Sequence, residues 1–203
     1  MCLKWANFAA SRIMVRRQGR MPRIIAGIAR GIQLAVPEGL DTRPTSDSRK
    51  EAVFSSIQFE LPGCRFLDLF AGSGAAGLEA LSRGAEHAVF VESGRQAVDC
   101  IHKNLTKTKL QAKGRVLAED VLSALSRLAR EQAQFDIIFL DPPYRRGYEE
   151  LVCREVMEKG LLAEDGLIVV ESAVETEFAV PQGMSITKSK SYRITKFTLL
   201  RRE

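Results

Sequence analysis

The chain of 203 residues has little of what builds metal sites and disulfides. It contains four cysteines and two histidines, and no Cys-x-x-Cys pair occurs. His87 and His102 have no ligand-like spacing to each other or to a cysteine. These counts and spacings argue against a zinc site and a disulfide framework. We therefore expect no metal, and unpaired cysteines fit a reducing, cytoplasmic compartment.

Long apolar runs, repeats and low-complexity tracts are also missing. No apolar run approaches the roughly 20 residues that a helix needs to cross a bilayer, so we expect no membrane partner. Residues 1–20 lack the continuous apolar region of a signal peptide, and we expect them to be a disordered extension. With 45% hydrophobic and 27% charged residues, the chain suffices for one globular domain and a small appendage.

Positive charge is concentrated at the N-terminal end. Residues 1–50 contain ten Lys and Arg but three Asp and Glu, a net charge of +7, whereas the remainder carries −2. Such a block indicates contact with a polyanion. A solvated basic tail without a partner is the alternative.

The order of predicted elements indicates an α/β fold. Residues 23–36 predict a β-hairpin and residues 46–61 a helix, so 21–61 form the N-terminal appendage. Apolar strands then alternate with helices, and the strands are predicted at 65–70, 87–92, 115–120, 135–141 and 166–172, with a helix at 148–162 before the last of them and extended segments at 184–192 and 194–202. This pattern predicts a mostly parallel sheet with helices on both faces. Ligands bind such sheets at the carboxyl ends of the strands.

A glycine-rich turn follows the first of these strands. Gly72, Gly74 and Gly77 match G-x-G-x-x-G, in which the glycines allow a tight turn, close approach of a ligand, and close packing of helix on strand. Glu92 ends the next strand, where a carboxylate can accept both hydroxyls of a ribose. Nicotinamide enzymes and S-adenosylmethionine enzymes share both features.

Two further carboxylates favour S-adenosylmethionine. Asp68 lies inside the first strand, four residues before Gly72. A carboxylate there repels a pyrophosphate but attracts a ligand with a sulfonium and an ammonium group. Asp120 ends the third strand and is placed to accept a hydrogen bond from an adenine amino group, although it can also cap the following helix.

The fourth strand ends in Asp141-Pro142-Pro143-Tyr144. The prolines fix φ and remove two N–H donors, so the carbonyl of Pro142 is held beside the carboxylate of Asp141. These two acceptors suit the two N–H bonds of an exocyclic NH2 group, and Tyr144 offers a face on which a base can stack. The arrangement predicts methyl transfer from sulfonium to nitrogen, assisted mainly by positioning.

The motifs "DLFAGSG" and "DPPY" resemble those of class I S-adenosylmethionine-dependent amino-methyltransferases. Within that superfamily the chain is most similar to the RsmD family of bacterial 16S rRNA guanine-N2 methyltransferases, through "RIIAGIARGIQL", "TRPTSDSRKEAVF" and "LEALSRGA". The resemblance implies a Rossmann-like methyltransferase domain at 62–203 with a seven-stranded sheet, preceded by an RNA-binding appendage. It also implies 16S rRNA as substrate, within a small-subunit ribosomal particle in the cytoplasm.

The resemblance also implies roles for individual residues. The guanine amine would be held by Asp141, Pro142, Pro143 and Tyr144. The cofactor would be bound by Asp68, Phe70, Gly72 and Gly74 around its methionine part, by Glu92 at its ribose, and by Asp120 and Val121 at its adenine. Arg43 and Thr45, in "TRPT", would lie over the cofactor or the entering base.

Other functions remain open at this point. The same chemistry can act on adenine N6 in DNA or RNA, or on a protein glutamine. The usual motif of glutamine enzymes carries Asn where this chain has Asp141, and DNA enzymes need a recognition domain for which few residues are left. A nicotinamide dehydrogenase would leave Asp68 and "DPPY" without a purpose. A binding protein without catalysis would be expected to have lost Asp141 or the glycines.

Overall fold

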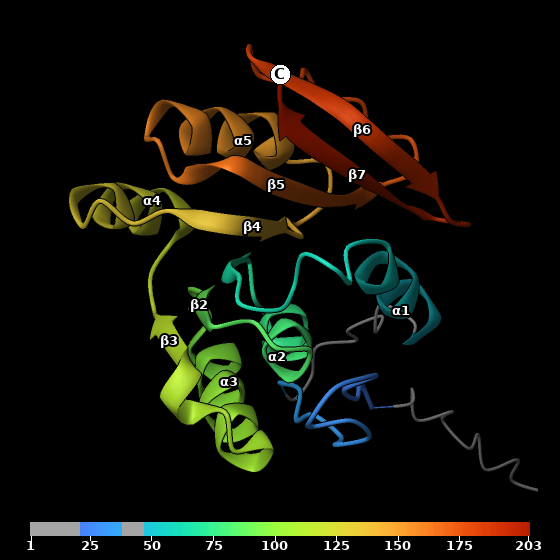
Figure 1. The fold of residues 1–203 in the computed structure, drawn as a ribbon, viewed down its shortest axis with the longest axis vertical. Helices are drawn as coiled ribbons and strands as arrows, with labels where there is room; N and C mark the ends of the chain where they lie inside the picture. Colours follow the sequence, from blue (N-terminus) through green and yellow to red (C-terminus); the bar gives the residue numbers. More distant parts are fainter. Residues whose placement is uncertain (1–20, 38–46) are drawn as a thin grey trace, which may run out of the picture.

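The computed structural model describes residues 21–37 and 47–203, and its centre is a seven-stranded sheet (Figure 1). The strand order is β3-β2-β1-β4-β5-β7-β6, in which β7 runs antiparallel to both of its neighbours and the other pairs are parallel. The elements in chain order are α1 (Asp47–Ser56), β1 (Arg65–Leu69), α2 (Ala75–Ser82), β2 (His87–Val91), α3 (Arg95–Thr108), η1 (Gln111–Lys113), β3 (Gly114–Leu117), α4 (Val121–Arg130), β4 (Phe135–Leu140), α5 (Tyr148–Glu158), β5 (Leu162–Ala173), β6 (Met184–Ser191) and β7 (Thr195–Arg202). The predicted α/β fold with a mostly parallel sheet is confirmed.

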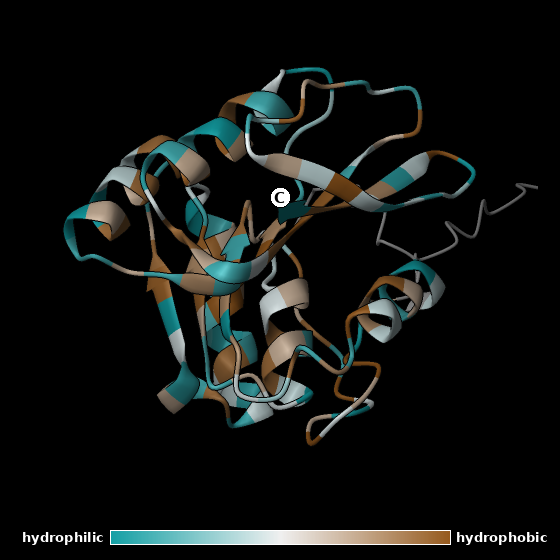
Figure 2. Cartoon of the chain, turned by 45° about the horizontal axis from the view of Figure 1, so that its top comes forward, coloured by the Kyte–Doolittle hydropathy of each residue, from teal (hydrophilic) through white to brown (hydrophobic). Residues whose placement is uncertain are grey.

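Each face of the sheet is covered by its own set of helices. Side chains alternate along a strand, so Ile137 and Phe139 of β4 face a core shared with α1, α2 and α3, whereas Ile138 and Leu140 face a core shared with α4 and α5. Figure 2 shows apolar residues concentrated along the strands, while hydrophilic residues alternate with them in the helices. This two-sided burial explains the near-continuous apolar strands of the sequence.

Residues 21–37 pack on the face of α1, α2 and α3 and belong to the same core. Ile24, Ala29 and Leu34 are buried in it. The predicted hairpin is wrong in extent, because its two strands are reduced to a single antiparallel bridge between Arg23 and Gln33. The physical reason is that the N–H groups of Ile25, Ala26 and Ala29 bond to side chains of α2, so only a few backbone bonds, such as that from Ile24 to Ile32, join the two halves of the segment.

The turn of this segment fits against the end of α2. Gly27 has a φ of +83°, and a Cβ at this position would lie 1.8 Å from the carbonyl oxygen of Ser82. Only glycine allows so close an approach of the two backbones. The hydroxyl of Ser82 accepts a bond from the N–H of Ala29 at 3.0 Å and donates one to the carbonyl of Ala26 at 2.6 Å. The segment is therefore fixed to α2 at backbone level.

A buried carboxylate in α2 holds the same segment. Glu79 is fully buried and accepts bonds from the N–H groups of Ile25 at 2.8 Å and Ala26 at 3.0 Å. Its charge is balanced by Arg83, whose Nε lies 2.8 Å away, and by the buried Lys50, whose Nζ lies 3.2 Å away. Because Lys50 belongs to α1, this one carboxylate joins α1, α2 and the N-terminal segment.

Element boundaries differ from the predictions in several places, and β3, predicted over 115–120, ends at Leu117. The helix predicted over 46–61 ends at Ser56, and the helix predicted over 148–162 ends at Glu158. Gly160 adopts a φ of +65°, which stops α5, and Leu162 then pairs with β4, so β5 begins four residues earlier than expected.

Candidate functional site

The glycine turn connects β1 to α2 at the carboxyl edge of the sheet. Phe70 has a φ of +60°, which is uncommon for a residue with a side chain, and Gly72 and Gly74 follow with φ values of +55° and +79°. A Cβ on Gly77 would lie 2.4 Å from the ring of Phe90 in β2, so this glycine lets α2 pack directly on the sheet. The turn thus presents its backbone toward the space above the strands.

Glu92 holds the turn from the neighbouring strand. Its Oε2 accepts a bond from the N–H of Gly72 at 2.8 Å, and its Oε1 accepts one from the N–H of Gly94 at 2.7 Å. Each carboxylate oxygen has a second lone pair, so both can also accept a bond from a ligand hydroxyl. The carboxylate is therefore oriented before any ligand arrives.

Asp68 is a buried carboxylate at the base of the same edge. It is 2% exposed, and its Oδ2 accepts a bond from the N–H of Gly77 at 2.8 Å. Burial raises the pKa of Asp68 to about 7, the bond from Gly77 opposes that increase, and the charges of Asp141 and Glu92 add to it. A site with this excess of negative charge is stabilised by a cationic ligand.

These residues line a first cavity of about 620 Å³, a size typical of small-ligand sites. Its walls include the sequence-predicted Asp68, Phe70, Gly72, Glu92 and Asp141. The N-terminal segment and α1 complete the walls with Pro22, Val36, Pro37, Lys50 and Phe54. The segment that was expected to serve as an appendage therefore also forms one side of this cavity.

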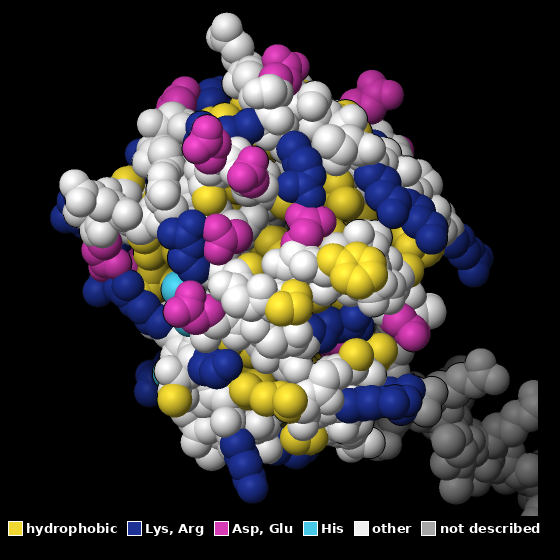
Figure 3. All heavy atoms as spheres, viewed as in Figure 1, with side chains coloured by type: hydrophobic (Ala, Val, Ile, Leu, Met, Phe, Trp, Pro, Cys, Tyr) yellow, Lys and Arg dark blue, Asp and Glu magenta, His cyan; other side chains and the backbone are white. Residues whose placement is uncertain are grey.

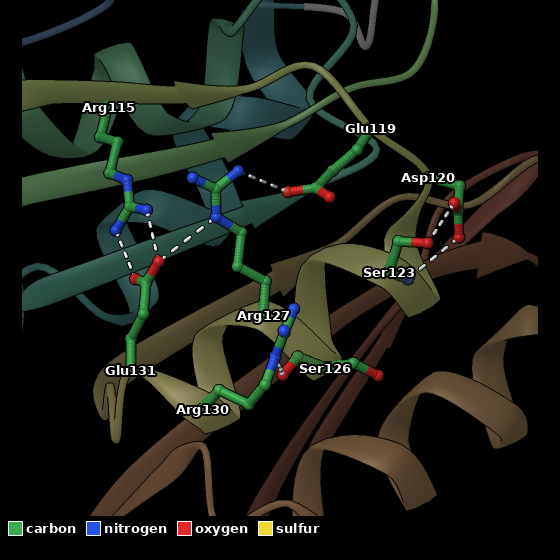
Figure 4. A network of polar contacts seen from close by, with 8 residues as sticks. All are labelled: Arg115, Glu119, Asp120, Ser123, Ser126, Arg127, Arg130 and Glu131. Atoms are coloured by element: carbon green, nitrogen blue, oxygen red, sulfur yellow. Dashed lines mark hydrogen bonds and ion pairs between the residues drawn. The ribbon is translucent and has the colours of Figure 1, made fainter.

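Asp120 and Val121 line another, smaller cavity of about 120 Å³, which is named the third cavity below. It shares Phe70 and Glu92 with the first cavity. Asp120 caps α4, because its Oδ1 accepts bonds from the N–H groups of Leu122 and Ser123, at 3.1 and 3.0 Å. Figure 4 shows the contacts between Asp120 and Ser123. The hydroxyl of Ser123 bonds to Oδ2 at 2.6 Å, and these bonds hold the pKa of Asp120 below its usual range. The helix-capping alternative is thus realised, and the contact with adenine stays a prediction.

Asp141 lies at the junction of the first cavity with a second one. Its N–H donates to the carbonyl of Leu69, at 3.5 Å, so the end of β4 lies beside the end of β1. The second cavity, of about 340 Å³, is lined by Asp141, Pro142, Pro143, Tyr144 and other residues of β5, β7 and α1. Burial raises the pKa of Asp141 to about 7, although the positive charge of Arg49 opposes that shift.

Tyr144 and the two prolines form one wall of the second cavity. Pro142 is buried and Pro143 is exposed, while Tyr144 is 40% exposed. Burial raises the pKa of Tyr144, and a hydrogen bond with Thr195 opposes that shift. Arg49 donates to the hydroxyl of Thr195, so α1, β7 and the proline turn meet at this cavity.

The structure brings together most of the predicted site. Ten of its residues line one or more of the three adjoining cavities, and Gly74 caps α2 beside them. Arg43 and Thr45 lie outside the described residues. The sequence interpretation missed Glu171, a buried acid that lines both the first and the second cavity. The sequence feature that could have indicated Glu171 is an acidic residue at the carboxyl end of the strand that lies next to β4.

Two other predictions concern absences. Within 21–37 and 47–203, no group of three or more His, Cys, Asp or Glu is arranged to hold a metal ion. Among the helices in those ranges, none has the length and apolar character to cross a membrane.

Comparison with known proteins gives a consistent set of relatives. Residues 22–201 match the family described as "Conserved hypothetical protein 95". The chain is 38% identical to the ribosomal RNA small subunit methyltransferase D of Escherichia coli, over 89% of this chain and 90% of that protein. The enzyme of the same name from Haemophilus influenzae is 33% identical, over 87% and 92%. The solved structure of the Escherichia coli protein yhhF has a TM-score of 0.79 at 38% identity and covers 89% of this chain and 97% of that one.

Proposed function

Because the chain belongs to the RsmD family of S-adenosylmethionine-dependent rRNA methyltransferases, we propose that it methylates the exocyclic N2 amine of a guanine in 16S rRNA. One observation carries this proposal. Asp141 lines the cavity that holds the glycine turn and also the neighbouring cavity that holds Tyr144. A methyl donor in the first and a base in the second would meet at this carboxylate.

The residues of the first cavity fit the cofactor. S-adenosylmethionine supplies a methyl group on a positively charged sulfur. The buried carboxylate of Asp68 gives the cavity a negative charge that suits this cation. Glu92 is oriented to accept bonds from the ribose hydroxyls, and Phe70, Gly72 and Gly74 would surround the methionine part. Asp120 and Val121 would contact the adenine from the third cavity.

Asp141 and Pro142 would hold the target amine. The carboxylate and the carbonyl of Pro142 accept its two N–H bonds, which turns the nitrogen lone pair toward the methyl group. The amine must lose one proton when it gains the methyl group. A carboxylate whose pKa is raised to about 7 is suited to accept that proton. Tyr144 supplies the face on which the unstacked guanine lies, and Pro143 stiffens the turn.

The surface beside the second cavity suits the phosphates of RNA. Ile194 and Thr195, at the turn between β6 and β7, line this cavity. Lys188, Lys190 and Arg193 are exposed on the same hairpin, and Figure 3 shows Lys and Arg side chains along the edge over β6. These cations, together with those of residues 21–37, would contact the backbone on either side of the target base. We expect this RNA to be presented to the enzyme within a small-subunit particle in the cytoplasm.

The test measures transfer of labelled methyl groups from S-adenosylmethionine to unmodified small-subunit RNA, and to particles assembled on it. We expect label to be recovered as N2-methylguanosine, with faster transfer to the particle. Recovery as N6-methyladenosine, or in protein glutamine, would instead support the alternative substrates and refute the proposal.

Replacement of the central carboxylate separates chemistry from cofactor binding. We expect Asp141→Ala to lower the rate about a hundredfold or more, because the amine loses its orientation, while calorimetry shows cofactor affinity within a few fold of wild type. Asp99→Ala, at an exposed position of α3, is the control and should leave both quantities unchanged. An equal loss of cofactor binding in Asp141→Ala would contradict the role assigned to this residue.

A further inference from the structure

A second carboxylate lies beside Asp141, on the next strand. Leu140 of β4 is paired with Val170 of β5, so Asp141 and Glu171 occupy corresponding positions one residue further along. Phe139 and Val169 face the core that includes α1, and side chains alternate along a strand. Asp141 and Glu171 therefore point to the same face of the sheet, from strands roughly 4.8 Å apart.

Glu171 is placed to act on a base in the second cavity. Its side chain is only 3% exposed, and it lines the second cavity together with Asp141 and Tyr144. Burial is the main cause of the raised pKa of Tyr144, and the charge of Glu171 adds to it more than the charge of Asp141 does, so this carboxylate lies within electrostatic reach of the phenol.

The carboxylates of Asp141 and Glu171 match two adjacent hydrogen-bond donors on the edge of guanine. Guanine has N1–H next to its N2 amine, so it offers adjacent donors to two adjacent carboxylates. Adenine and 2-aminopurine have a lone pair at N1, which a carboxylate repels. Asp141 cannot make this distinction, because it contacts only the amine.

We propose that Glu171 identifies the target base as guanine by accepting the hydrogen bond of N1–H, while Asp141 and Pro142 hold the N2 amine. This inference rests on the proposed function and adds the residue that selects the base. Arg49 lines the same cavity and donates to Thr195. Its guanidinium carries five N–H donors and would face O6, which guanine has and 2-aminopurine lacks.

The test compares bases that differ at N1. The methylated nucleotide is first mapped with wild-type protein, and small-subunit RNA is then ligated with guanine, 2-aminopurine or inosine at that position and assembled into particles. Methyl transfer is measured for wild type, Glu171→Gln and Glu155→Gln. Glu155 lies on α5, where it pairs with Lys159 away from both cavities, and serves as the control.

We expect wild type and Glu155→Gln to prefer guanine over 2-aminopurine by roughly tenfold or more in kcat/KM, because the carboxylate of Glu171 accepts a bond from N1–H of guanine but repels the lone pair at N1 of 2-aminopurine. In Glu171→Gln the amide can either accept a bond from N1–H or donate one to the N1 lone pair, so the preference for guanine over 2-aminopurine is lost. Cofactor affinity, measured by calorimetry, and the melting temperature should stay near wild type.

Two results would overturn the inference. One is wild-type protein that methylates guanine and 2-aminopurine equally well. The other is a Glu171→Gln variant that slows transfer to both bases by the same factor, as a purely structural role would. Inosine tests the proposed function separately, since it lacks the N2 amine. Label that persists on the inosine particle would refute N2 methylation itself.

Discussion

Replacement of Glu79 by alanine should detach the N-terminal segment and, with it, one wall of the first cavity. In the folded protein this carboxylate serves two backbone N–H groups, Arg83 and the buried Lys50. Removing one partner of a buried ion pair leaves an uncompensated charge and typically costs about 3–5 kcal/mol. For a domain of this size, such a loss corresponds to a decrease of roughly 6 to 20 °C in melting temperature.

The assay is urea unfolding at neutral pH, combined with calorimetry of S-adenosylmethionine binding. We expect a lower urea midpoint and a weaker affinity, because Pro22, Val36 and Lys50 line the first cavity. Glu131→Ala is the matched control. Glu131 also accepts bonds from two arginines, Arg115 and Arg127, but all three groups lie at the surface (Figure 4).

Water screens the exposed network of Glu131, so its loss should hardly change the urea midpoint. If Glu79→Ala and Glu131→Ala lowered stability by similar small amounts, burial would not be what makes the Glu79 network strong. If Glu79→Ala lost stability but bound the cofactor as wild type does, the N-terminal segment would not be a necessary wall of the cavity.

Two further predictions concern the first cavity. Because folding raises the pKa of Asp68 to about 7, its ionised form is disfavoured in the empty site and favoured by a cationic ligand, so cofactor affinity should increase as pH rises through about 7. Calorimetry between about pH 5.5 and pH 8 measures this increase, which Asp68→Asn should reduce; a flat wild-type profile would contradict it. Gly77→Ala should lower the free energy of unfolding by about 1–3 kcal/mol, because the added Cβ would lie 2.4 Å from the ring of Phe90. Urea unfolding measures the loss, and an unchanged midpoint would show that α2 can move away from the sheet without penalty.

The sequence was sufficient to predict the sheet and the edge that carries the site. Apolar strands alternating with helices require a covered parallel sheet, and parallel strands bring Asp68, Glu92 and Asp141 to one edge although they lie far apart in the chain. Glu171 was missed although its strand was predicted at 166–172, because its place beside Asp141 depends on the register in which β5 pairs with β4. That pairing is a tertiary contact, which local patterns do not record.

The outcome of other sequence predictions depended on competition between local hydrogen bonds and hydrogen bonds to distant parts of the chain. The segment 23–36 has the residues of a hairpin, yet Glu79, Ser82 and Asn104 take up much of its backbone hydrogen bonding. A buried glutamate inside a helix gives no sequence signal of that role. Asp120 shows the opposite case, since one residue satisfies a helix cap while lining a cavity, and the sequence alone supports both roles.

The attachment of residues 21–37 also has a consequence for the order of assembly during synthesis. Their bonds to Glu79, Ser82 and Asn104 span 53 to 69 positions of the chain. A segment translated early must therefore wait for α2 and α3 to leave the ribosome before it can dock. One wall of the first cavity closes only then, so in a nascent chain this cavity cannot be complete before the central helices have folded.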